Sequence, residues 1–367
     1  MKQSTAIPES DTRRVPTSTR SGDGTTAQLS VTMMETRDVD RYRKRIEGVE
    51  LDMVRGGPDQ RSSRTLCVNG APGVVFSAVE PGCKTISHTC IEHDRISVAY
   101  MLEAAPGTRW CGGIDMTPGM FVVHQPDAEH TAVNEPGTRF AFTIIDLDAL
   151  AERSELLESP LQPFRPGDVD VVASSRRSED VALLLGHLAA TTAQSISAQL
   201  MDDLLTAVVL CMSVSQTDRR LRISPAVDSR KVVGDCIDFA ESIGREPSIA
   251  EMCIVAHVSG RRLRQAFQDT FQLSPKRFFR SWVLCRAHDD LLASPPHDTS
   301  VTGVATDLGV THLGRFATQY RELHGERPSQ TLLRSPELVG VPAAEATYDV
   351  WASRTKVSVP VEAHSAT

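Results

Sequence analysis

The feature that most constrains the fold of this chain is a repeat offset by 53 positions between residues 247 and 333. When the first copy is shifted onto the second, similar residues fall at matching places. The matched pairs are Arg262 with Arg315, Leu263 with Phe316, Phe267 with Tyr320, Gln272 with Gly325, and Pro275 with Pro328. A segment that recurs in this way is built from one supersecondary unit used twice.

Each copy has the pattern of a helix, a tight turn and a second helix. Apolar residues at helical spacing form one face of each helix. In the first copy these are Ile249, Met252, Cys253 and Ala256, then Leu263, Ala266 and Phe267; the second copy begins with Val301, Val304, Ala305 and Leu308. Turns are predicted at His257-Val258 and at Gly309, with Ser259 and either Thr311 or His312 as helix N-caps. Two helix-turn-helix units are therefore expected.

Basic side chains are concentrated on and after the second helix of the first unit. Residues 261–286 contain seven basic residues and one acidic residue, a net charge of +6, whereas the whole chain carries −8 with a pI of about 5.8. The basic residues are Arg261, Arg262, Arg264, Lys276, Arg277, Arg280 and Arg286. A basic patch on an acidic protein is typical of a surface that binds nucleic acid. No apolar run approaches the length of a membrane span, so no membrane partner is expected.

This region resembles the DNA-binding domain of the AraC/XylS family of bacterial transcription regulators. The residues that carry the resemblance are Ser259, Leu263, Phe267, Leu273-Ser274-Pro275, Ala305, Gly309, Arg315-Phe316, Tyr320, Gly325 and Pro328-Ser329. The resemblance implies two helix-turn-helix units held by one long helix, with recognition helices in successive major grooves of double-stranded DNA. It also implies a cytoplasmic homodimer that responds to a small-molecule effector, works with RNA polymerase and activates transcription.

The two units differ at the positions that would face DNA. The first presents Arg261, Arg264 and Gln265, whereas the second presents Gly314, Ala317 and Thr318, which offer few hydrogen bonds to base edges. We expect base contacts from Arg261, Arg264, Gln265 and Thr318, and phosphate contacts from Ser259, Arg262, His312, Arg315 and Arg321. The region also departs from the family pattern with Cys253 for Ala, His257 and Gln272 for Gly, and Val310 for Phe. Since His tolerates positive φ better than most residues, the first turn should survive.

Residues from about 35 to 150 are predicted to be β-rich. Pro-Gly pairs, which mark tight turns, occur at residues 72, 81, 106, 118 and 136. Between them lie strand candidates at 85–91, 96–102, 120–124, 131–133 and 139–145, a pattern that favours a sandwich or barrel. The stretch GMFVVHQPDAEHTAVN is similar to the second cupin motif, with Gly119, Pro126, His130 and Asn134 near their places. Trp110 and Phe121 either line a pocket in this barrel or belong to its core.

No catalytic residue, cofactor or metal site is predicted. A metal cupin needs a His-x-His pair and a Glu on one strand, and the chain has no His-x-His, although His88, His93, His124 and His130 are present. The eight cysteines include no Cys-x2-Cys pair and are interpreted as reduced structural thiols. A cupin-type metal enzyme or ligand carrier with a degenerate helical module is the alternative hypothesis. A DNA-binding architectural protein without sequence preference is a third.

The predicted fold class is α+β with two domains. A disordered tail spans 1–30 and a cupin-like sensor or dimerisation domain spans 31–216, with a helical segment at 177–216 that either packs on the barrel or forms a dimer seam. A linker at 217–229 leads to the DNA-binding domain at 230–335, followed by a C-terminal tail at 336–367.

Overall fold

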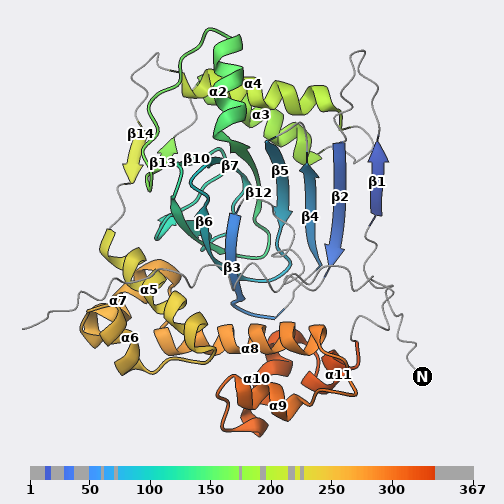
Figure 1. Cartoon of the computed structure of the whole chain (residues 1–367), viewed down its shortest axis with the longest axis vertical. Coiled ribbons are helices and arrows are strands. Elements are labelled where there is room, and N and C mark those ends of the chain that lie inside the picture. The colour runs from blue at the N-terminus through green and yellow to red at the C-terminus, as the bar shows by residue number, and fades with distance from the viewer. Residues whose placement is uncertain are drawn as a thin grey trace, which may run out of the picture.

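Two β-sheets form the N-terminal part of the molecule and helices form the C-terminal part, as the sequence predicts (Figure 1). The computed structural model describes residues 13–17, 29–36, 49–58, 62–69, 73–172, 176–190, 196–213, 220–223 and 227–334. The predicted C-terminal tail at 336–367 lies outside these residues. The sheets lie between two helical layers, one at the top of Figure 1 and one below.

The larger sheet has nine antiparallel strands among the described residues. In order across the sheet they are β1 (Arg13–Thr17), β2 (Leu29–Thr36), β4 (Ser63–Asn69), β5 (Val74–Glu80), β12 (Arg139–Asp146), β7 (Arg95–Glu103), β10 (Phe121–His124), β13 (Val169–Val172) and β14 (Arg220–Ile223). The smaller sheet has the order β3 (Val49–Arg55), β6 (Thr85–Ile91), β11 (Glu129–Asn134), β8 (Arg109–Trp110) and β9 (Ile114–Asp115). Their facing sides enclose an apolar interior.

The five strands expected between residues 85 and 145 are present as β6, β7, β10, β11 and β12. Four of the predicted Pro-Gly turns have a glycine at positive φ, namely Gly73, Gly107, Gly119 and Gly137. Two strands lie in segments predicted to have no regular structure: β1 lies in the predicted tail and pairs with β2, and β14 lies in the predicted linker and pairs with β13. Backbone hydrogen bonds at a sheet edge form without apolar side chains, so these strands leave little hydrophobic pattern in the sequence.

Helices α2 (Leu147–Leu156), α3 (Arg176–Ala190) and α4 (Ala198–Met212) cover the larger sheet at the top of Figure 1. Leu188, Leu204 and Val208 are buried in one cluster with Phe76 of β5. Most of the apolar stripe predicted for 177–216 therefore faces the sheet. Leu183 is an exception, at 71% exposure.

The C-terminal helices are α5 (Val227–Ile243), α6 (Ile249–Val255), α7 (Gly260–Phe271), α8 (Pro275–Ala293), α9 (Val301–Asp307), α10 (Leu313–His324) and α11 (Pro328–Leu332). The long helix α8 runs below β3 and joins the two helix-turn-helix units (Figure 1). The core of this part continues into the smaller sheet, since Val54, Ile86 and Val133 are buried in the same cluster as Phe267 and Trp282. The two parts of the molecule therefore share an apolar interface.

Candidate nucleic-acid interface

The first helix-turn-helix unit consists of α6 and α7, and its boundaries follow from their caps. Ser248 and Glu251 form a reciprocal capping box at the start of α6. The turn contains His257 at a φ of 52°, as predicted for this position. Ser259 caps α7, its hydroxyl accepting from the Arg262 N–H at 3.3 Å. These contacts fix where α7 begins and therefore which of its side chains face outward.

Arg245 contacts both units, the first through an ion pair with Glu251 and the second through its side-chain stem against Gly309. The Arg245 Nη2 atom donates to Glu251 Oε1 at 2.6 Å, and this hydrogen bond, with those from Ser248, lowers the pKa of Glu251 to about 2. A lowered carboxyl pKa stabilises the fold above its unfolded value of 4.5, and the benefit is lost as the pH falls toward 2. Arg245 also lies against Gly309, the turn residue of the second unit.

Four of the five matched pairs of the repeat have the same structural role in both units. Phe267 and Tyr320 are fully buried, and Leu263 and Phe316 are buried beside them. Gln272 and Gly325 both end their helices in the left-handed region, at φ of 56° and 75°. Pro275 and Pro328 both begin the next helix. The structure thus confirms the repeat found in the sequence.

Tyr320 differs from Phe267 in carrying a hydroxyl, which has partners in the core of the second unit. Tyr320 Oη lies 2.7 Å from His288 Nδ1 on α8 and donates to Thr331 Oγ1 of α11 at 2.8 Å. Thr331 Oγ1 in turn donates to Glu326 Oε1 at 2.7 Å. The second unit is therefore attached to α8 partly by polar contacts, whereas the first uses the aromatic rings of Phe267, Phe271, Phe278 and Phe279.

The four residues predicted to contact bases are all exposed. On α7, Arg261, Arg264 and Gln265 lie on its outer face, and Gln265 Nε2 donates to Asp269 Oδ1 at 2.6 Å. On α10, Thr318 donates back to the Gly314 carbonyl at 3.1 Å. That bond occupies the one hydroxyl proton of Thr318, so α10 offers fewer donors to a base edge than α7 does.

Four of the residues predicted to contact phosphate are exposed, namely Ser259, His312, Arg315 and Arg321. Arg262 is half-buried, and its Nη2 atom donates to Ser229 Oγ on α5 at 2.9 Å. This contact orients the guanidinium of Arg262 toward α5. The sequence predicted either Thr311 or His312 as the N-cap of α10. His312 occupies this position, without a hydrogen bond from its side chain to the helix.

Replacing Gly309 by Ala is expected to lower the free energy of unfolding by about 1–2 kcal/mol, the cost of a left-handed residue with a Cβ. Gly309 has a φ of 76°, and a Cβ there would lie 3.2 Å from the Arg245 side chain. The matched control is Gly314→Ala, because Gly314 is helical with open space around it. Urea denaturation of the full chain measures both. Equal stability of the two variants would contradict the role of this turn.

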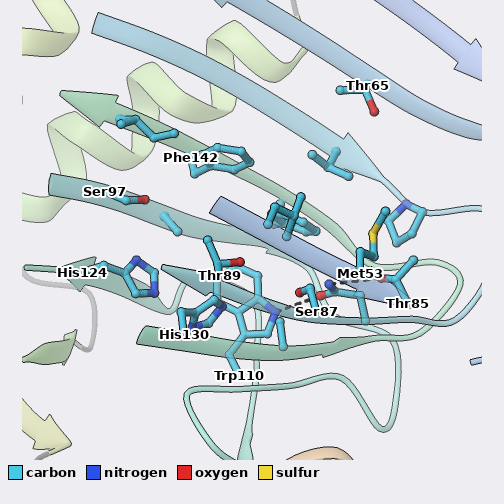
Figure 2. A pocket seen from close by; sticks show the side chains of 18 of the residues that line it. Met53, Thr65, Thr85, Ser87, Thr89, Ser97, Trp110, His124, His130 and Phe142 are labelled. Carbon is cyan, nitrogen blue, oxygen red and sulfur yellow. Dashed lines mark hydrogen bonds between the residues drawn. The ribbon is translucent and has the colours of Figure 1, made fainter. Parts of the chain in front are cut away.

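The β-sheets enclose a cavity of about 100 Å3. Both sheets contribute to its lining, which includes Met53, Thr89, Trp110, His124, His130 and Phe142 (Figure 2). The indole N–H of Trp110 donates to Asn134 Oδ1 at 2.8 Å. Of the two aromatic candidates from the sequence, Trp110 lines this cavity, and Phe121 belongs to the core under the helices.

A family model for a helix-turn-helix domain matches residues 252–334. The XylDLEGF operon transcriptional activator of Pseudomonas putida is 35% identical over 92 residues, which are 25% of this chain and 29% of that protein. The chain belongs to the AraC/XylS family of regulators. Another member, a probable thc operon regulatory protein of Rhodococcus erythropolis, is 31% identical over 106 residues, 29% of this chain and 32% of that protein.

The match to these two curated AraC/XylS relatives spans about a third of their length. A solved structure of a probable AraC family regulator from Rhodopseudomonas palustris is 34% identical, covering 28% of this chain and 96% of that chain, with a TM-score of 0.26. In the part of the chain that the structure describes, no helix has the length and apolar character needed to cross a membrane.

Proposed function

We propose that this protein is a sequence-specific transcription activator whose first helix-turn-helix unit reads bases and whose second unit positions the chain on phosphates. The observation that carries the proposal is the difference between two exposed faces at equivalent positions of the repeat. Arg261, Arg264 and Gln265 project from α7, whereas α10 presents Gly314 and Ala317 there.

The chemistry of the α7 face suits the edges of bases in the major groove. An arginine can donate two hydrogen bonds to guanine, and glutamine can pair in the same way with adenine. The Ser259 cap fixes the start of α7, so the Arg261 and Arg264 side chains leave the helix from its first turns. Residues at this end of a recognition helix are those that reach base edges in helix-turn-helix proteins.

The α10 face suits the DNA backbone. Arg315 and Arg321 are exposed on this helix, and His312 is exposed at its start. Contacts of this kind fix the register and orientation of a protein on the duplex without reading sequence.

Arg315→Ala is expected to weaken binding to specific and random DNA by the same factor. Because a lost phosphate contact releases about one counterion fewer, the slope of log K against log salt should become shallower by about 0.9. Fluorescence anisotropy across a salt series, with the two DNAs in parallel, measures both quantities. A loss confined to the specific site would show instead that Arg315 reads a base.

The N-terminal part is proposed to sense a small-molecule effector and to form the homodimer. Its cavity, which is lined by apolar side chains together with hydroxyl, imidazole and amide groups, has the character of a ligand pocket. We assign residues 31–216 to this sensor and dimerisation domain and 230–335 to the DNA-binding domain. RNA polymerase is the proposed partner at the promoter, and the cytoplasm the proposed location.

Mapping the bound sites of the full chain across its own genome tests this function. Discrete sites that share a sequence upstream of genes are expected. Binding spread evenly over the genome would favour an architectural protein and would overturn the proposal.

A further inference from the structure

Three side chains with metal-binding chemistry meet at one end of the cavity. They are Cys111, just after β8, His124, at the end of β10, and His130 on β11. All three are buried, and their thiol and imidazole ligand atoms lie within 4.8 Å of one another. Figure 2 shows His124 and His130 side by side, and their ring centroids are 4.4 Å apart.

The spacing of these atoms fits a tetrahedral metal centre. The Cys111 sulfur lies 3.7 Å from His130 Nδ1. In a tetrahedral zinc site with Zn–S of about 2.3 Å and Zn–N of about 2.05 Å, a sulfur and a nitrogen ligand are about 3.6 Å apart. A set of one thiolate and two imidazoles also binds Zn2+ in preference to the hard cations Mg2+ and Ca2+.

The backbone at Cys111 holds this arrangement at a conformational cost. Cys111, Gly112 and Gly113 all have positive φ, at 53°, 79° and 118°. A cysteine in the left-handed region is uncommon, and such strain collects at functional sites. The turn is secured by Thr131 on β11, whose carbonyl accepts from the Cys111 N–H at 2.9 Å and whose hydroxyl accepts from the Gly112 N–H at 3.0 Å.

We propose that Cys111, His124 and His130 bind a thiophilic divalent cation, with Zn2+ the best fit. Three protein ligands leave one coordination position open, as in zinc sites that exchange a ligand. The two imidazoles also line the cavity, so the cavity provides room for a water molecule or a small-molecule donor. This ligand set differs from the His-x-His and Glu arrangement of metal cupins.

The same turn connects the metal ligands to the DNA-reading helix. A Cβ on Gly113 would lie 2.7 Å from the backbone carbonyl of Asp269 on α7, so the two backbones are in close contact. Arg109, on the other side of the turn, donates to the Gln272 amide oxygen at 2.9 and 3.0 Å when that amide is turned toward it. Resting on the proposed function, we infer that occupancy of the site changes the affinity of the protein for DNA.

Titration of the metal-free full chain with Co2+ and Zn2+ tests the site. We expect about one ion per chain and a thiolate-to-cobalt charge-transfer band with visible bands of tetrahedral Co2+. Removing a residue that only hydrogen-bonds to a metal ligand lowers metal affinity by about 10–100-fold. Replacing a ligand itself, as in Cys111→Ser or His130→Gln, should therefore weaken binding by at least that factor. Cys83→Ser is the matched control, because Cys83 is buried but lies outside the cluster.

Circular dichroism shows whether each variant is folded. Two different ligands are replaced, so that the test still holds if one of the variants does not fold. Absence of stoichiometric binding, or binding by Cys111→Ser as tight as that of Cys83→Ser, would overturn the site. In that case the short Cys111–His130 contact is a buried thiol–imidazole hydrogen bond only.

The link to α7 is tested by DNA affinity with and without the metal. We expect a change of at least about fivefold in the wild type, the lower end of measured coupling between sites. Gly113→Ala should retain the metal but lose this dependence, since its methyl group displaces the turn from α7. An unchanged affinity on metal loading would overturn the link. If neither form binds DNA, the proposed function fails while the titration still decides the metal site.

Discussion

Phe267→Ala is expected to lower the free energy of unfolding of the helical part by about 3–5 kcal/mol. The ring is fully buried and lies 5.6 Å from Phe278 and 5.7 Å from Phe279, between centroids. Its loss leaves a cavity between α7 and α8 that rigid helices cannot fill. Urea-dependent hydrogen exchange of α7 and α8 peptides measures the effect, with β5 and β12 peptides as an internal reference.

Tyr320 gives a graded comparison at the equivalent position of the second unit. Tyr320→Phe keeps the ring but removes the contacts with His288 and Thr331, so a loss of about 1–3 kcal/mol is expected from the buried polar groups. Leu333→Ala serves as the control, because Leu333 is 62% exposed.

Exchange rates unchanged by Phe267→Ala would contradict the shared core of α7 and α8.

Arg264→Ala is expected to reduce affinity for the best DNA site by about 5–150-fold, the equivalent of the 1–3 kcal/mol that a good bidentate base contact contributes. Affinity for random DNA should fall much less, because a base contact is made only at the matching sequence. Arg261→Ala should behave in the same way at a neighbouring base pair.

The control for Arg264→Ala is Arg64→Ala, which removes the same charge from an exposed position on β4 of the larger sheet. Gel-shift titrations on the specific site and on random DNA compare the three proteins. Equal losses on both DNAs for Arg264→Ala would reassign this residue to the phosphate backbone.

The sequence predicted the helical part well because its determinants are local. The cap at Ser259, the positive φ at His257 and Gly309, and the paired burial of Phe267 and Tyr320 all follow from spacing and residue type. The strand β6 begins and ends where the pattern placed it, at residues 85 and 91. The DNA contacts remain predictions, although the exposed positions of these side chains are compatible with them.

Features that depend on long-range contact could not be predicted in this way. Cys111 and His130 come together because β8 and β11 pair, and His124 arrives from the other sheet. No spacing in the sequence marks this meeting, and a search for His-x-His passes over it. The contact between Gly113 and Asp269 likewise joins residues from different parts of the molecule. The one local signal of the metal site in the sequence is the glycine pair Gly112-Gly113 directly after Cys111.

The division between a base-reading α7 and a phosphate-binding α10 is tested most directly by a single-base scan of the bound site. Each base pair is replaced in turn, and the affinity of the wild-type full chain is measured at one salt concentration. Penalties of about 1–3 kcal/mol are expected in the major-groove segment facing α7, with small effects about one helical turn away, where α10 lies. Comparable penalties in both segments would contradict one-sided reading.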